Sequence, residues 1–174
     1  DEAYVEFAPK GIAPEINADD ERVIRFRTFS KAYGMAGARV GYAICNIELA
    51  LAFNKIRNHF GMSRISQAGA LAALSDLSHL KDTIKNVNDA KNRIYEIALK
   101  NKLTAIPSAT NFVAIDCGEG QDKANKIMNG LILEGIFVRM PFVSPQNRCI
   151  RISAGRPKDL DLFEQVLPSV LDKI

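Results

Sequence analysis

"FRTFSKAYGMAGARVGY", residues 26–42, decides the fold that we expect for this chain. It begins inside an alternating run, "ERVIRFRTFS" (21–30), that predicts a β-strand. A loop rich in small residues follows, and residues 37–45 predict a second short strand. Lys31 stands just after the first strand, and Arg39 comes eight positions later (39 − 31 = 8). One loop between two strands therefore carries an amine and a guanidinium.

The composition is that of an ordinary globular protein. The chain has 174 residues, of which 47% are hydrophobic and 25% charged, and its net charge is +3. Lysine and arginine are scattered among acidic residues, which argues against a nucleic-acid or membrane surface. No apolar stretch approaches the ~20 residues of a membrane span, and we recognise no signal peptide. We therefore expect a cytoplasmic protein.

The cysteines and histidines form no pattern typical of a disulfide or metal site. Cys45, Cys117 and Cys149 are odd in number and widely spaced, without a CxxC pair. His59 and His79 stand alone and are expected to have surface or packing roles. We expect no metal and a reducing compartment.

Apolar periodicity predicts the remaining elements. In the first half, helices are expected at 46–59, 66–77 and about 80–100. Asn46 should cap the first of these helices and Gly61 should end it, while Lys91 interrupts the apolar stripe of the third. After Pro107 the expected elements are a strand at 111–117, a helix at 122–135, strands at 136–140 and 148–153, and a helix at 158–174. Pro168 should break or kink the last helix.

The loop after the first strand has the groups that an aldehyde cofactor requires. A lysine amine condenses with an aldehyde when desolvation or a nearby cation keeps it unprotonated. Lys31 has Arg39 as a neighbouring cation, and the planar guanidinium of Arg39 also suits a phosphate. Thr28 and Ser30 add hydroxyls, and the small residues at 32–41 let a ligand approach the backbone closely. An aldehyde that bears a phosphate describes pyridoxal phosphate.

Pyridoxal phosphate makes two further demands on a protein. Its ring nitrogen needs a facing carboxylate to stay protonated, and its phenolic oxygen needs a hydrogen-bond partner. Asp1 and Tyr4, three residues apart, have the two required groups.

Three segments of the chain resemble those of a known family. "DEAYVEF" (1–7), "TFSKAYGMAGARVGY" (28–42) and "CIRISAG" (149–155) are similar to segments of the fold-type I pyridoxal-phosphate aminotransferases, in particular the histidinol-phosphate aminotransferase branch. The resemblance implies an α/β fold. On this resemblance, the chain divides into three parts. These are the C-terminal portion of the large cofactor-binding domain (1–79), a long connecting helix (80–102) and a small α+β C-terminal domain (103–174). It covers only the family's C-terminal half, so we expect a fragment that is inactive alone.

The resemblance also implies roles for the residues around the cofactor. Lys31 would form the Schiff base and then move the proton between the substrate α-carbon and the cofactor. Asp1 would pair with the ring nitrogen, and Tyr4 would bind the phenolic oxygen. The residues that would hold the cofactor phosphate are Thr28, Ser30 and Arg39.

For the substrate, the resemblance implies two arginines and a transamination. Arg151 would grip the α-carboxylate, and Arg139 would bind the phosphate on the substrate side chain. The donor would be histidinol phosphate or an amino acid such as an aromatic one, and the acceptor a 2-oxo acid such as 2-oxoglutarate. The resemblance further implies a homodimer.

Simpler interpretations stay open. Lys31 and Arg39 could be surface charges, Asp1 and Tyr4 an ordinary turn, and Arg151 the polar face of a strand. The whole could be a lyase of the same fold, such as a threonine-phosphate decarboxylase, or a truncated remnant without catalysis. "GEGQDK" (118–123) lacks the GxxxxGK[ST] pattern of a phosphate loop and is expected to be a turn into a helix.

Overall fold

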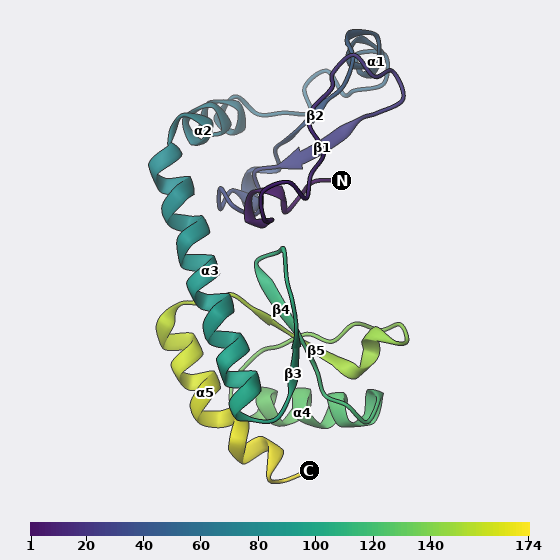
Figure 1. Ribbon diagram of the computed structural model, residues 1–174. Coiled ribbons are helices and arrows are strands. Elements are labelled where there is room, and N and C mark those ends of the chain that lie inside the picture. The colour runs from purple at the N-terminus through teal and green to yellow at the C-terminus, as the bar shows by residue number, and fades with distance from the viewer. The chain divides into compact units, whose positions relative to one another are not determined.

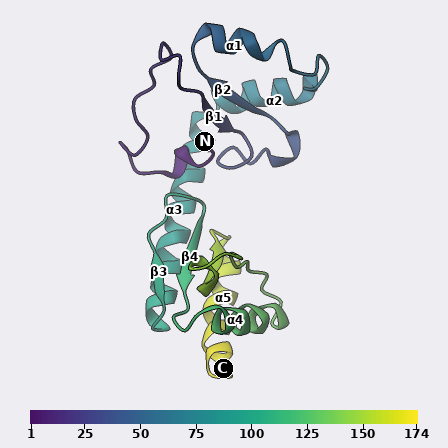
Figure 2. The same ribbon diagram turned by 90° about the vertical axis from the view of Figure 1, so that its right-hand side faces the viewer.

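The computed structural model describes residues 1–174. The chain forms two compact units, Asp1–Ile84 and Lys85–Ile174. The division falls within α3 (Leu77–Lys100), which is one unbroken helix (Figures 1 and 2). No helix combines the length and the hydrophobicity that crossing a bilayer requires.

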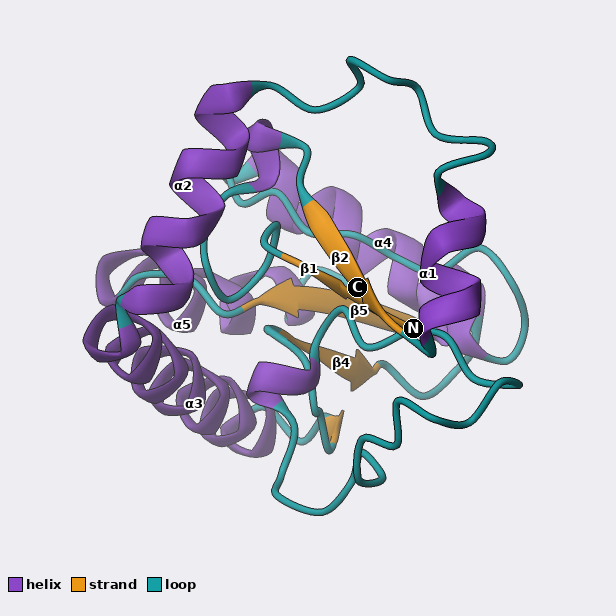
Figure 3. Ribbon diagram, turned by 90° about the horizontal axis from the view of Figure 1, so that it is seen from above, coloured by secondary structure: helices purple, strands orange, loops and turns teal.

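The first unit is built on a two-stranded antiparallel sheet. β1 (Arg25–Thr28) pairs with β2 (Gly41–Ile44), as Figure 3 shows, so both strands predicted here are present in shorter form. Thr28 lies opposite Gly41, and a Cβ at Gly41 would stand only 2.7 Å from the carbonyl oxygen of Arg27. Only glycine therefore lets the two strands approach this closely at the mouth of the loop.

Two helices follow the sheet within the first unit, α1 (Ile47–Phe53) and α2 (Arg64–Ser75). The Asn46 side chain accepts a hydrogen bond from the N–H of Leu49 (2.9 Å), which confirms the predicted cap. The prediction that Gly61 ends this helix is wrong, because α1 already ends at Phe53. Ile56 and Phe60 beyond it are exposed, and a helix without a packed apolar face is not stable over further turns.

The second unit packs helices on one face of an antiparallel sheet. The strands β3 (Thr104–Ile106), β4 (Phe112–Asp116) and β5 (Cys149–Ser153) lie in the order β3-β4-β5. The sequence analysis missed β3, a strand of three residues. The helices are α3, α4 (Gln121–Leu133) and α5 (Pro157–Leu171), as seen in Figure 1.

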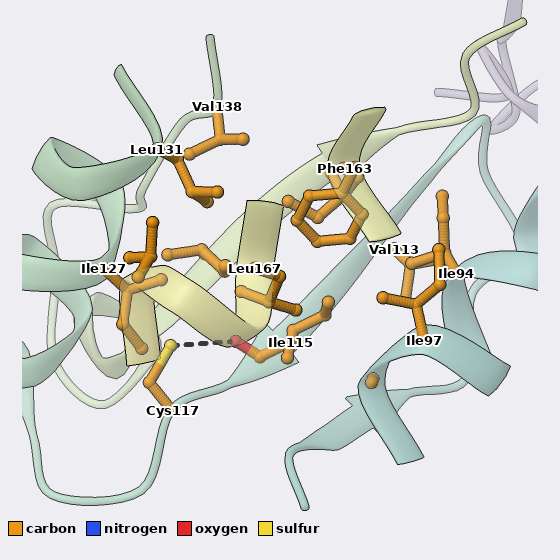
Figure 4. Packing of buried hydrophobic residues seen from close by; sticks show 14 of the residues in the cluster. Ile94, Ile97, Val113, Ile115, Cys117, Ile127, Leu131, Val138, Phe163 and Leu167 are labelled. Atoms are coloured by element: carbon orange, nitrogen blue, oxygen red, sulfur yellow. Dashed lines mark hydrogen bonds between the residues drawn. The ribbon is translucent and has the colours of Figure 1, made fainter. Parts of the chain in front are cut away.

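The core of the second unit draws on all three helices and on alternate residues of β4 and β5. Figure 4 shows this packing, whose most buried members include Ile94, Ile97, Val113, Ile115, Ile127, Leu131, Ile150, Phe163 and Leu167. Since alternate residues of a strand share one face, the other face of the sheet is left to residues such as Arg151.

Lys91 interrupts the apolar stripe of α3, yet it is buried. Its Nζ donates a hydrogen bond to the carbonyl oxygen of Ser108 (3.1 Å), and burial lowers the pKa of the Lys91 amine. The buried amine thus keeps one hydrogen-bond partner, which offsets part of the cost of taking it out of water.

One predicted strand of the second unit is wrong. Residues 136–140 form no strand, and only Arg139 makes a bridge, to Arg151 of β5. Pro141, two residues later, has no N–H to extend the pairing. Of the two outcomes predicted for Pro168, a break is excluded, because α5 continues to Leu171 with Leu167 and Val170 held in the core, and a kink stays a prediction. The predicted turn at 118–123 is confirmed, since Gly118 and Gly120 have positive φ and α4 begins at Gln121.

Core packing can be tested at neighbouring positions of α5. Phe163 is 2% exposed and Leu162 is 43% exposed. Phe163→Ala should lower the free energy of unfolding of the second unit by about 3–5 kcal/mol, because it leaves a cavity among packed side chains. Leu162→Ala should cost less than about 1 kcal/mol. Urea unfolding followed by circular dichroism measures both, and equal costs would contradict this assignment of the core.

Candidate active site

A cleft of about 430 Å³ in the first unit gathers most of the residues singled out around Lys31. Its lining is Asp1, Ala3, Phe26, Arg27, Thr28, Ser30, Lys31, Ala36 and Arg39. Five of the six residues expected at the cofactor line this cleft. The sixth, Tyr4, lies beside it, with the centre of its ring 5.2 Å from the Lys31 Nζ.

The loop that carries Lys31 is closed by main-chain hydrogen bonds of Phe29. The N–H of Phe29 donates to the carbonyl oxygen of Val40 (3.2 Å), and its own carbonyl accepts from the N–H of Met35 (2.9 Å). Phe29 and Val40 are buried together with Ala70 of α2. The apolar residues are thus buried, and Lys31, two residues after Phe29, is left half-buried at the cleft.

Thr28 ends β1 with its hydroxyl oriented by the loop. The N–H of Ser30 donates to Thr28 Oγ1 (3.0 Å). Because the oxygen accepts this bond, the hydroxyl hydrogen of Thr28 is left to donate elsewhere. Both residues line the cleft, so two hydroxyls and the amine of Lys31 face the same space.

Arg39 has an uncommon backbone conformation. Its φ is 50° and its ψ 49°, in the left-handed region that non-glycine residues rarely adopt. Its Nη1 donates to the carbonyl oxygen of Ala36 (2.8 Å), which directs the exposed guanidinium along the loop at the cleft. Backbone outliers of this kind concentrate at functional sites.

Glu2, which the sequence analysis did not single out, lies between two arginines of β1. Its carboxylate pairs with Arg25 and with the Nε of Arg27 (2.9 Å). Burial alone would raise the pKa of Glu2, but the hydrogen bonds and charges of Arg25 and Arg27 outweigh it and hold this pKa below its usual value. The sequence did contain a signal for this pairing. Arg25 and Arg27 alternate on one face of the strand, and two neighbouring positive charges there favour an acidic residue beside them.

Glu6 is a second acidic residue that the sequence analysis missed. Its Oε2 is buried without a hydrogen-bond partner, and burial raises the pKa of its carboxyl group. Burial also raises the pKa of Tyr33, and the charge of Glu6 raises it further. No pattern in the sequence indicates this burial, which arises only when residues 5–7 fold onto the sheet as a short 3-10 helix.

Arg139 and Arg151 face each other in the second unit. Each N–H donates to the other residue's carbonyl oxygen, at 3.4 Å from Arg139 and 2.6 Å from Arg151. Residues paired in this way present their side chains on the same face, and like charges directly opposite one another are unfavourable. The guanidinium of Arg151 lies 4.7 Å from the ring centre of Phe112, and that of Arg139 lies 5.9 Å from that of Phe137.

The two arginines line a largely apolar pocket of about 710 Å³. The remaining walls come from α4 and the segment before β5, and include Met128, Phe137 and Phe142. Two guanidinium groups in one pocket with an apolar wall suit an anion attached to an apolar group.

Comparisons with known proteins match nearly the whole chain, including the cleft around Lys31 and the pocket of Arg139 and Arg151. Residues 1–166 match the family model described as aminotransferase class I and II. The chain is 37% identical to a histidinol-phosphate aminotransferase of Methylococcus capsulatus over 98% of its own length and 46% of that protein. It is 33% identical to one of Carboxydothermus hydrogenoformans, over 99% and 48%. The chain spans about half the length of the curated relatives it matches.

A solved structure also matches the chain over about half of its own length. The crystal structure of histidinol-phosphate aminotransferase from Sinorhizobium meliloti in complex with pyridoxal-5'-phosphate superposes with a TM-score of 0.95 at 50% sequence identity. The match covers 99% of this chain and 48% of that one. The expected fold, with its small α+β C-terminal part, is thereby confirmed.

The Glu2 ion cluster leads to a test of stability against pH. The folded pKa of Glu2 lies below its ordinary value of 4.5, so its contribution is present above about pH 4.5 and is lost as the pH falls through the folded value. Glu2→Gln should therefore be less stable than the wild type at neutral pH, and the difference should shrink in acid.

Urea unfolding at neutral pH and near pH 3 measures this difference. Glu21→Gln is the matched control, because Glu21 is an exposed carboxylate just before β1. A gap between Glu2→Gln and the wild type that stays constant with pH would contradict the assignment.

Proposed function

The chain belongs to the aminotransferase class I and II family, and from this membership we propose that it carries the C-terminal half of a pyridoxal-phosphate-dependent aminotransferase. Lys31 is the proposed cofactor-binding lysine. The observation that supports this most directly is the single cleft lined by Lys31, Arg39 and Asp1. A homodimer stays a prediction from the resemblance, and a cytoplasmic location stays a prediction from the composition.

The cleft residues fit the chemical groups of pyridoxal phosphate. An amine suits its aldehyde, a guanidinium with two hydroxyls suits its phosphate, and a carboxylate suits its ring nitrogen. The open backbone of the loop at Ala36, which lines the cleft, leaves room for a ligand beside these groups. When bound, the cofactor supplies an electron sink that stabilises negative charge on the substrate α-carbon.

Each of the protein's own groups at the cleft has a separate proposed role. The Nζ of Lys31 moves the proton at the substrate α-carbon. The Thr28 hydroxyl, which already accepts from the N–H of Ser30, would donate its hydrogen to the cofactor phosphate, and the Arg39 guanidinium would donate to the same phosphate. Asp1 accepts from the N–H of Ala3 through Oδ1 (2.9 Å), and its carboxylate would face the ring nitrogen. Tyr4 would donate to the phenolic oxygen.

In the second unit, Arg151 and Arg139 are the proposed substrate-binding pair. Their positive charges favour a ligand with negative groups, such as the phosphate of a phosphorylated amino donor or the carboxylates of a 2-oxo acid. The names of the relatives favour histidinol phosphate as this donor and a 2-oxo acid as acceptor. They likewise favour transamination over decarboxylation, and product analysis for an oxo acid or carbon dioxide separates these reactions.

Lys31→Ala tests the cofactor assignment. The wild-type chain should develop an absorbance band with pyridoxal phosphate that resists dialysis, and Lys31→Ala should lack it, because the amine is gone. Lys10→Ala removes another lysine amine, one that is exposed and does not line the cleft, and should leave the band unchanged. A band that persists in Lys31→Ala, or its absence from the wild type, would contradict the proposal.

Steady-state kinetics of the complete enzyme distinguish the proposed roles of Arg139 and Arg151. Arg139→Ala should raise KM for histidinol phosphate at least about tenfold more than for phenylalanine, because only the first carries a phosphate. Arg151→Lys should lower kcat/KM for every amino donor, since an ammonium cannot reproduce the planar two-point contact with a carboxylate or a phosphate. Equal effects of Arg139→Ala on both donors would remove the phosphate assignment.

A further inference from the structure

Glu2 lies in the chain between two of the proposed cofactor residues, Asp1 and Tyr4, but does not itself line the cleft. Its side chain is 14% exposed and pairs with Arg25 and with Arg27, of which Arg27 is itself part of the cleft lining. The two arginines are two residues apart, so they share one face of the strand and can hold the two oxygens of one carboxylate.

Arg25 is tied to the protein on its other side as well. Its side chain is 8% exposed. Its Nη2 donates to the carbonyl oxygen of Pro14 (2.8 Å), and its Nη1 to that of Glu15 (3.0 Å). Glu2 is thus paired with a guanidinium that a second loop already fixes in place. Removing one partner of such a buried pair leaves the other charge uncompensated.

The main chain at Glu2 is also bound to β1. The N–H of Glu2 donates to the carbonyl oxygen of Phe26 (2.8 Å). Two residues further along the same strand, Thr28 faces the cleft together with Asp1. The strand that ends at the proposed phosphate site therefore also holds the segment that carries the proposed ring-nitrogen partner.

From these contacts we propose that Glu2 is the positioning residue of the site, and that its ion cluster with Arg25 and Arg27 anchors residues 1–4 on β1 so that Asp1 stays at the cleft. The role toward the cofactor rests on the proposed function. The anchoring itself rests only on the contacts above. Glu2 acts through Asp1 and touches neither the cofactor nor the substrate.

Amide hydrogen exchange tests the anchor without any ligand. Glu2→Gln keeps the size of the side chain and removes its charge. It should speed exchange at the N–H of residue 2 and of Ala3 by about tenfold, because these bind Phe26 and Asp1. Glu21→Gln, which removes an exposed carboxylate, should leave both rates unchanged. Unchanged exchange in Glu2→Gln would overturn the proposal.

Cofactor affinity tests whether the anchor acts through Asp1. Glu2→Gln should raise the Kd for pyridoxal phosphate about tenfold, and in the Asp1→Asn background it should raise it no further. A purely structural role would instead give additive losses in the double variant, and that result would overturn the proposal.

Two further measurements distinguish a failure of the Glu2 proposal from misfolding of the variant and from a failure of the proposed function. If Glu2→Gln does not fold, as judged by circular dichroism, Arg27→Gln replaces it, because this variant keeps the more buried pair of Glu2 with Arg25. It should likewise speed exchange at Ala3, and no change there would overturn the proposal. Absence of a Lys31-dependent band in the wild type would instead remove the proposed function, while the exchange rates would still decide whether Glu2 anchors the segment.

Discussion

The antiparallel pairing of β1 with β2 is the constraint on which the candidate site depends. The pairing brings Thr28 opposite Gly41, and the main-chain bonds of Phe29 then close the intervening loop. A loop closed at both ends has few conformations, so Lys31 and Arg39 are held at one cleft although eight positions separate them. The burial of Phe29 and Val40 stabilises this closure, because opening the loop would expose both side chains.

The arginines discussed above have different partners in the two units. In the first, the carboxylate of Glu2 pairs with two arginines of one strand within the folded protein. In the second, Arg139 and Arg151 meet across a bridge and lie over aromatic rings instead of pairing with an acid. In the first cluster, every charged group has an opposite charge beside it. A pair of like charges is relieved by an anion, which is why a structural role fits the first cluster and a binding role the second.

Much of the fold follows from local patterns. Alternation predicted β1, and the apolar patterns farther along the chain predicted β4, β5, α3 and α4. The errors occur where local pattern and tertiary context disagree. Residues 54–60 have helical periodicity but no core to pack on, and residues 136–140 have strand character but make only one bridge. Conversely, Pro168 is tolerated in α5 because the last turn is held by buried neighbours.

By itself, the sequence determined the chemical types at the site and their spacing along the chain. The Lys31 and Arg39 segment, the Asp1 and Tyr4 pair and the strand around Arg151 could all be recognised there, because a motif is a local property. Only the tertiary structure decided that Glu2 pairs with both Arg25 and Arg27, that Glu6 is buried, and that Arg139 stands opposite Arg151. These facts depend on which residues distant in the chain meet in space. Such contacts are set by the packing of the whole chain, and a local pattern does not specify which distant residue becomes the partner.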